Sequence, residues 1–151
     1  MRIHLNIGSN LGDRAAYLQR ALELLAREFE GAEIHTAGPV ESEPWGYDSP
    51  NPYLNLGVMV DLPAAMAPER VLDITQRVEC AVGEGAPHRN ADGSYRDRPV
   101  DIDIIGIDSI VLRTPRLTLP HPRAALRPFV MQPLQQLDPE AAAFVEATAA
   151  Q

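Results

Sequence analysis

The chain contains no lysine, and all 13 of its basic residues are arginines. This absence excludes enzymes that form a Schiff base on lysine, P-loop proteins with their phosphate-binding lysine, and a lysine general base. The one cysteine, Cys80, excludes an internal disulfide and a cysteine-rich zinc site. We expect Cys80 to be an inert core side chain, because it falls at a mostly apolar position of a predicted helix.

Long hydrophobic runs are also missing. No segment approaches the roughly 18 consecutive apolar residues of a membrane span. The first residues, 1–7, lack the long apolar core of a signal peptide. We therefore expect a cytoplasmic protein that has no membrane contact.

Size and charge narrow the class further. With 151 residues, 45% of them hydrophobic, the chain is expected to form a single globular domain over residues 1–151. Its net charge of -8 argues against a nonspecific nucleic-acid binder, which needs a basic face. Nothing in the sequence demands a dimer, and we expect a monomer.

Hydrophobic periodicity predicts an alternation of strands and helices. The expected strands are 2–7, 33–42, 53–62 and 100–107, with short ones near 110–112 and 116–119. The expected helices run from Leu11 to about Gly31, from Pro68 to about Ala81, over 123–127 and over 139–149. Prolines and glycines predict loops at 43–52 and 83–97, the second long enough to be functional or mobile. This order predicts an α+β, ferredoxin-like split βαβ arrangement, in which helices pack on a mostly antiparallel sheet in α/β/α layers.

Two carboxylates on one predicted strand form the first candidate site. Asp101 and Asp103 alternate with Val100, Ile102 and Ile104, so the acids share the face opposite the buried one. Paired like charges favour a bound divalent cation, and hard oxygen ligands favour Mg²⁺. A solvated strand face with incidental acids remains the alternative at this point.

The surrounding arginines favour a phosphate site. Eight of the 13 lie within residues 77–127, which hold seven acids, so this window is near +1 and the remainder near -9. Carboxylates that bind Mg²⁺ beside arginines suit phosphoryl transfer. The alternative is that these arginines and acids simply pair with one another.

Three other features each allow two interpretations. His121 stands between two prolines, where it can donate to a phosphate or close a strand end. The Gly8-Ser9-Asn10-Leu11 turn is also what any capped strand-to-helix turn looks like. Trp45, Tyr47, Tyr53 and Asn55 can stack on and pair with a flat heterocycle, or Trp45 can simply anchor a loop.

Together these segments resemble the 6-hydroxymethyl-7,8-dihydropterin pyrophosphokinase family over nearly the whole chain. The most specific match is Asp97-Arg98-Pro99-Val100-Asp101-Ile102-Asp103-Ile104-Ile105. Five further matches are Ile7-Gly8-Ser9-Asn10-Leu11, Glu41-Ser42-Glu43-Pro44-Trp45-Gly46, Tyr53-Leu54-Asn55, Gln76-Arg77-Val78-Glu79, and Leu117-Thr118-Leu119-Pro120-His121-Pro122 followed by Arg127-Pro128-Phe129. The resemblance implies an ATP- and Mg²⁺-dependent enzyme that moves pyrophosphate from ATP to the pterin's hydroxymethyl oxygen and releases AMP in folate biosynthesis.

The resemblance also implies roles for individual residues. The catalytic set would be Arg98, Asp101, Asp103 and His121, with two Mg²⁺ ions held by Asp101 and Asp103. ATP, the co-substrate, would be bound by Gln76, Glu79, Arg89, Arg98, Ile104, Arg116, His121 and Arg127. The pterin would be bound by Gly8, Ser42, Pro44, Trp45, Tyr53, Asn55, Tyr95, Asp101 and Phe129. Its partners would be these small molecules alone.

One segment departs from the family pattern. Glu84 stands where an arginine is expected, and Ala86 replaces another commonly basic position. A carboxylate near polyphosphate is repulsive by about 1 kcal/mol or more, unless Arg89 and Arg96 reach in from the same loop. The departure motivates an alternative, a non-catalytic pterin- or nucleotide-binding relative. A plain ferredoxin-like interaction or regulatory module is a third hypothesis, which explains neither the acidic pair nor the arginines.

Overall fold

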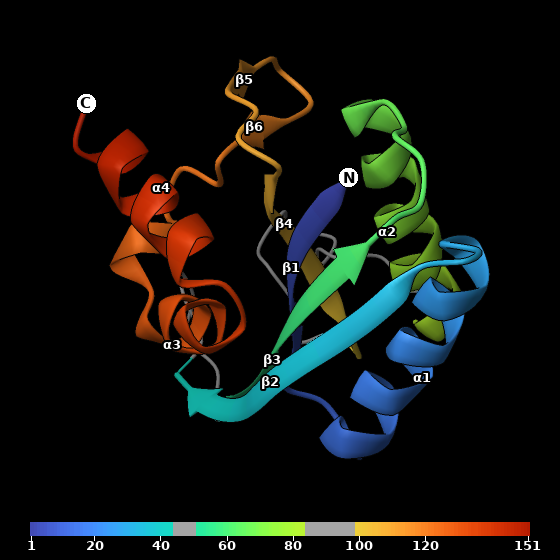
Figure 1. Ribbon diagram of the computed structural model, residues 1–151. Coiled ribbons are helices and arrows are strands. Elements are labelled where there is room, and N and C mark those ends of the chain that lie inside the picture. Colours follow the sequence, from blue (N-terminus) through green and yellow to red (C-terminus); the bar gives the residue numbers. More distant parts are fainter. Residues whose placement is uncertain (44–50, 84–98) are drawn as a thin grey trace.

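The computed structural model describes residues 1–43, 51–83 and 99–151. A four-stranded antiparallel sheet forms its middle layer, with helices on both faces (Figure 1). The elements in chain order are β1 (Arg2–Ser9), α1 (Arg14–Glu28), β2 (Glu33–Ser42), β3 (Tyr53–Asp61), α2 (Pro68–Val82), β4 (Asp101–Ile107), β5 (Leu112–Arg113), β6 (Thr118–Leu119), a 3₁₀ turn (Ala124–Leu126), α3 (Pro128–Leu137) and α4 (Pro139–Ala149). The loops expected at 43–52 and 83–97 fall largely outside the described residues.

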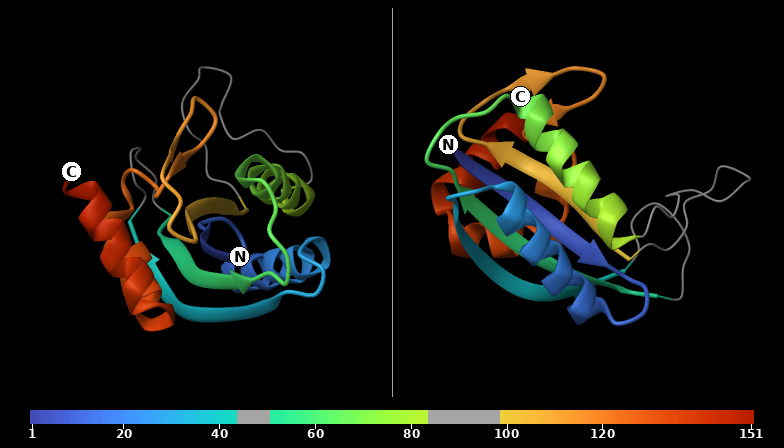
Figure 2. Two further views of the ribbon diagram at one scale, coloured as in Figure 1. Left: turned by 45° about the horizontal axis from the view of Figure 1, so that its top comes forward. Right: turned by 90° about the vertical axis from the view of Figure 1, so that its right-hand side faces the viewer.

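The strand order in the sheet is β2-β3-β1-β4, and each neighbouring pair is antiparallel. The chain therefore leaves β1 through α1 and leaves β3 through α2, and both helices return to the same face of the sheet. The two views in Figure 2 show α1 and α2 together on this face. The predicted ferredoxin-like α+β arrangement is confirmed.

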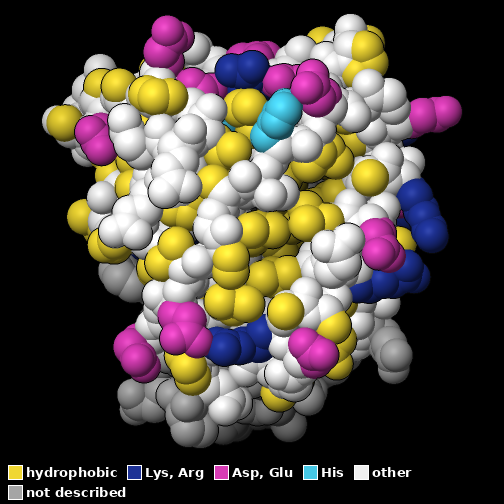
Figure 3. All heavy atoms as spheres, turned by 60° about the horizontal axis from the view of Figure 1, so that its bottom comes forward, with side chains coloured by type: hydrophobic (Ala, Val, Ile, Leu, Met, Phe, Trp, Pro, Cys, Tyr) yellow, Lys and Arg dark blue, Asp and Glu magenta, His cyan; other side chains and the backbone are white. Residues whose placement is uncertain are grey.

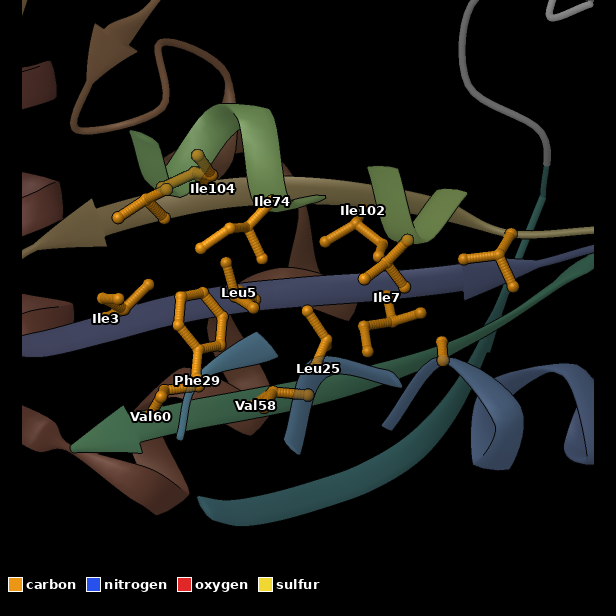
Figure 4. Packing of buried hydrophobic residues seen from close by; sticks show 14 of the residues in the cluster. Ile3, Leu5, Ile7, Leu25, Phe29, Val58, Val60, Ile74, Ile102 and Ile104 are labelled. Atoms are coloured by element: carbon orange, nitrogen blue, oxygen red, sulfur yellow. The ribbon is translucent and has the colours of Figure 1, made fainter. Parts of the chain in front are cut away.

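The alternating strands bury their larger apolar face against α1 and α2. Ile3, Leu5 and Ile7 of β1 point into this core and are at most 2% exposed. Figure 4 shows them interleaved with Leu25 of α1, with Phe29 just after α1, with Ile74 of α2 and with side chains of neighbouring strands. This core occupies one face of the sheet, and the other face carries α3, α4 and the residues of the candidate site.

Helix α1 begins later than the apolar spacing indicated. Asp13 is its N-cap, and the Asp13 side chain accepts a hydrogen bond from the Ala16 amide at 3.1 Å. Leu11, which we placed on the apolar stripe, precedes the helix and is 37% exposed. The helix ends at Glu28, and Gly31 follows with φ of 79°, a left-handed conformation that glycine adopts without strain.

The opposite face of the sheet is covered by α3 and α4, and here the sequence prediction was incomplete. The helix expected at 123–127 is a 3₁₀ turn over Ala124–Leu126, and α3, which follows it, was not predicted. Ile105, Val130, Leu134, Ala142 and Val145 belong to a second, smaller buried cluster on this face. Pro133 lies inside α3, which is why the pattern did not read as a helix.

Helix α4 is tied to β1 through its N-cap. The Asp138 side chain accepts from the Ala141 amide at 3.2 Å. Its other carboxylate oxygen lies 3.0 Å from His4 Nε2 and 3.2 Å from an Arg2 guanidinium nitrogen. This group closes the end of the sheet that is remote from Asp101.

Strand β2 is an outer strand of the sheet. It carries two devices typical of protected edges, a break in register between Ala37 and Val40 and a proline, Pro39. Figure 3 shows the molecule from this side, with hydrophobic side chains gathered in the middle and charged ones around the rim.

Cys80 is exposed, so its expected place in the core was wrong. The buried stripe of α2 runs through Val71, Ile74, Val78 and Val82. Cys80 lies two residues from both Val78 and Val82, which on a helix is nearly the opposite side. Helical phase, rather than the apolar character of the side chain, decides its position.

Candidate active site

Strand β4 presents Asp101 and Asp103 on the face opposite the larger core. Val100, Ile102 and Ile104 are 2%, 6% and 4% exposed, whereas both aspartates are half-exposed. The predicted alternation is therefore confirmed, and the two carboxylates stand side by side on one strand. The β1–β4 register pairs Gly8 with Asp101 and Asn6 with Asp103.

A third carboxyl group lies beneath this pair. Glu79 of α2 is 8% exposed, and its Oε2 accepts a hydrogen bond from the Ile102 amide at 2.7 Å. Burial and the negative charge of Asp101 raise the pKa of Glu79 to about 8. Glu79 thus fastens α2 to the start of β4, where the aspartates stand, and is neutral near pH 7 in the free protein.

Arg127 faces the aspartates from the start of α3. One of its guanidinium nitrogens lies 3.5 Å from Asp103 Oδ2, and the guanidinium carbon is 5.9 Å from the centroid of the Phe129 ring. Its side chain is only 12% exposed, and burial lowers its pKa without neutralising it. A fixed cation therefore stands between the acidic pair and an aromatic ring.

His121 completes this side of the site. Its backbone amide donates to the Ile105 carbonyl at 2.9 Å, and its Nδ1 accepts from the Arg123 amide at 3.1 Å. Burial and the positive charges of Arg127 and Arg123 lower the pKa of His121 to about 4. The imidazole is therefore neutral near pH 7, and because Nδ1 accepts, its proton lies on Nε2. That Nε2–H is a donor suited to a phosphate oxygen.

A group of polar side chains lies at the ends of β1, β2 and β3 that adjoin Asp101. The Asn55 amide nitrogen donates to the Val40 carbonyl at 3.0 Å and to Ser42 Oγ at 2.8 Å, which leaves Asn55 Oδ1 as the acceptor for a ligand. A Cβ at Gly8 would lie 3.1 Å from a Tyr53 ring carbon and 3.2 Å from Asn55 Oδ1. Glycine at position 8 therefore lets these two side chains lie close over β1.

Comparison with known proteins places this arrangement in a family. The model of the 7,8-dihydro-6-hydroxymethylpterin-pyrophosphokinase (HPPK) family matches residues 4–139. The chain belongs to the HPPK family. The match includes Asp101, Asp103, His121 and Arg127.

Curated HPPK relatives span nearly the same length. The chain is 40% identical over 139 residues to a 2-amino-4-hydroxy-6-hydroxymethyldihydropteridine pyrophosphokinase of Porphyromonas gingivalis, covering 91% of this chain and 90% of the relative. Enzymes of the same name from Aquifex aeolicus and Bacillus subtilis are 32% and 31% identical, each over 91% of this chain and 80% and 81% of the relative. None of these relatives supports the non-catalytic alternative, whose motivating residues, Glu84 and Ala86, lie outside the described ranges.

The remaining predicted HPPK site residues are spread more widely. Gln76 is exposed on α2, and Arg116 reaches α2 through a 2.8 Å ion pair with Asp73. The Ile104 side chain is in the larger core, so that only its backbone borders the site. Pro44, Trp45, Arg89, Tyr95, Arg96 and Arg98 lie outside the described residues, and their roles stay predictions.

The alternative explanation, that the arginines of residues 77–127 pair with acidic side chains instead of binding phosphate, holds for two of the described arginines. Arg77 pairs with Glu28 of α1 through two hydrogen bonds of 3.0 and 3.1 Å, so it links the two helices. Arg116 likewise pairs with Asp73. Of the described arginines in this window, Arg127 is the one that pairs with the acidic couple itself, at Asp103.

The HPPK acidic pair fits Mg²⁺ in the way the resemblance implies. Mg²⁺ is often held by one or two carboxylates, with waters and substrate phosphates as the other ligands. In residues 1–43, 51–83 and 99–151, no three His, Cys, Asp or Glu side chains form a metal-binding group. Asp101 and Asp103 therefore suit an open site that a phosphate-bearing substrate completes.

One residue of this face was missed by the sequence reasoning. Asn6 is 4% exposed, and its amide nitrogen donates to the Phe129 carbonyl at 3.3 Å. The signal was its place on the polar side of strand 2–7, between His4 and Gly8.

In the described part of the chain, no helix is both long and apolar enough to traverse a bilayer.

Proposed function

We propose that this protein transfers the pyrophosphoryl group of ATP to the hydroxymethyl oxygen of 6-hydroxymethyl-7,8-dihydropterin and releases AMP, a step of folate biosynthesis. The observation that carries the proposal is the placement of Asp101 and Asp103 in an HPPK-family chain. Both stand on the open face of β4: Asp103 is 3.5 Å from the cation Arg127, and Asp101 is in register with Gly8, which is itself in register with Asn55.

The phosphate side works by positioning and charge. The pterin oxygen forms a bond to the β-phosphorus, the bond from that phosphorus to the α-phosphate oxygen breaks, and the hydroxyl proton passes to Asp103 or water. His121 donates from Nε2 and Arg127 from its guanidinium to phosphate oxygens, which offsets the charge that develops on them. Asp101 and Asp103 would hold Mg²⁺, which would supply further positive charge at the phosphates. Glu79 keeps β4 in place through Ile102.

The pterin side selects a flat, hydrogen-bonding ring. Asn55 Oδ1 accepts from a ring N–H, because both of its amide hydrogens are engaged by β2. Phe129, half-buried at the start of α3, offers an aromatic face for stacking. The proposal further includes two Mg²⁺ ions, which the family resemblance and the acidic pair support, together with a monomeric state and a cytoplasmic location.

The test is product identity. The protein is incubated with the pterin, ATP and Mg²⁺, and the nucleotide products are separated. We expect AMP and pterin diphosphate in equal amounts. Formation of ADP, or of no nucleotide product, would overturn the proposal.

Variants localise the activity. Asp101→Asn and Asp103→Asn should each lower the rate of AMP formation by about 100-fold or more, because each removes a charge that faces the phosphates. Asp108→Asn is the matched control, since Asp108 follows β4 at its other end and its carboxylate accepts from the Arg2 amide, a bond that asparagine keeps. It should retain the wild-type rate.

A further inference from the structure

Pro133 gives α3 an unusual carbonyl in its first turn. In an α-helix, the carbonyl of Phe129 would accept from the amide of residue 133. Proline has no amide hydrogen, so this bond cannot form. The Phe129 carbonyl therefore needs a donor from outside the helix.

Asn6 is that donor. Its side-chain nitrogen lies 3.3 Å from the Phe129 oxygen, across 123 positions of sequence, and the residue is 4% exposed. In the sheet, Asn6 is in register with Gly57 of β3 on one side and Asp103 of β4 on the other. It thus lies on the strand next to β3, and β3 and β2 are the two strands on which α3 packs.

Gly57 belongs to the same arrangement. A Cβ at this position would overlap the Cβ of Pro133, so glycine lets the proline lie directly on β3. Asn6 and Gly57 are paired across β1 and β3. Gly57 makes room for the Pro133 ring, and Asn6 donates to the Phe129 carbonyl, which has no donor at position 133.

We infer that Asn6 is a positioning residue for Phe129, and through it for the aromatic wall of the pterin site. The inference rests on the proposed function, which gives the Phe129 ring its ligand. The Asn6 hydrogen bond fixes the backbone of Phe129 relative to β1, and therefore fixes the distance of its ring from Asn55 and Gly8. Arg127, two residues earlier, spans the gap to Asp103. Asn6 bonds to Phe129 itself, whereas Arg127 keeps its own ion pair with Asp103, so loss of the Asn6 bond should affect the pterin side before the phosphate side.

A double-mutant cycle tests the hydrogen bond without reference to activity. Asn6→Leu keeps the branched shape of the side chain and removes the donor, and Pro133→Ala restores an amide hydrogen at position 133. Asn6→Leu should raise the unfolding equilibrium constant at least about fivefold in the wild-type background, the factor expected for one buried hydrogen bond. In the Pro133→Ala background the increase should be less than about twofold. Asn6→Ala is measured in parallel, because it removes the donor without the methyl groups by which Asn6→Leu could clash with its neighbours. Equal costs in both backgrounds would overturn the inference.

Steady-state kinetics test the positioning role. Asn6→Leu should raise the KM for the pterin about fivefold or more and leave the KM for ATP within about twofold. Pro133→Ala, combined with it, should bring the pterin KM back toward the wild-type value. The control is His4→Phe, which breaks the bond to Asp138 on the same face of β1, and which should lower stability without changing the pterin KM.

The outcomes separate the inference from the proposed function. A wild-type protein that neither binds the pterin nor forms AMP would refute both. An active wild type whose Asn6→Leu variant has an unchanged pterin KM, or equal rises in both KM values, would refute the positioning role alone.

Discussion

Replacing Glu79 by glutamine should change how the stability of the protein depends on pH. Glu79 is 8% exposed, and burial beside Asp101 raises its pKa from 4.5 to about 8. Between these values the carboxyl group is protonated in the folded state and ionised in the unfolded state, so unfolding releases a proton. The stability contributed by Glu79 is therefore full below about pH 4.5 and is lost as the pH rises through 8.

The size of the effect follows from the shift. Each pKa unit corresponds to about 1.4 kcal/mol, so the full shift sets an upper limit of about 5 kcal/mol. Relaxation around the charge and entry of water reduce such penalties, and we expect about 2 kcal/mol. Glutamine keeps the acceptor for the Ile102 amide and cannot ionise. Glu79→Gln should therefore gain stability relative to wild type by about this amount between pH 5 and pH 9.

Urea unfolding at intervals across this range measures the difference. EDTA is included so that no divalent cation binds at Asp101. Glu146→Gln, at an exposed position of α4, is the control and should differ from wild type by a constant amount. A Glu79→Gln curve that runs parallel to the wild-type curve from pH 5 to pH 9 would refute the reasoning.

Three further predictions concern other parts of the molecule. Gly57→Ala should lower the free energy of unfolding by about 1–3 kcal/mol, measured by urea titration, because its Cβ would overlap Pro133. Since burial lowers the pKa of His121 to about 4, its contribution to stability is lost as the pH falls below about 6.5, and thermal unfolding of His121→Gln should be less acid-sensitive than that of wild type. Arg77→Ala should cost less than about 1 kcal/mol in thermal unfolding, because its pair with Glu28 is largely exposed.

Local patterns were sufficient to predict most of the fold. The alternation in β1 and β4 and the spacing of Leu18 and Leu25 in α1 each follow from burial of one face, which a single segment records by itself. The α3 helix was not predictable in this way. Its internal proline fits only because two residues far away in the sequence accommodate it: Asn6 bonds to the Phe129 carbonyl, and Gly57 leaves space for the proline ring.

In the candidate site, too, local patterns predicted the features that lie within one element and missed the contacts between elements. Period-two alternation was enough to place Asp101 and Asp103 on one face, since both lie on one strand. The approach of Arg127 to Asp103 and the bond between Glu79 and Ile102 join separate elements, so no local spacing encodes them. Cys80 was misplaced because residue type was weighed above its angular position on α2.

The division of the buried side chains into two clusters has a consequence for partial unfolding of the protein. The smaller cluster draws its buried residues from the segment between Ile105 and Val145, whereas most of the larger one comes from the chain before it. The layer formed by α3 and α4 can therefore detach as a cooperative unit while the sheet stays packed on α1 and α2. Amide hydrogens of α3 and α4 should exchange with deuterium sooner than those of β1, and each such opening would carry Phe129 and Arg127 away from Asp103. The equilibrium constant of that opening sets the fraction of molecules in which Phe129 and Arg127 are apart from Asp103.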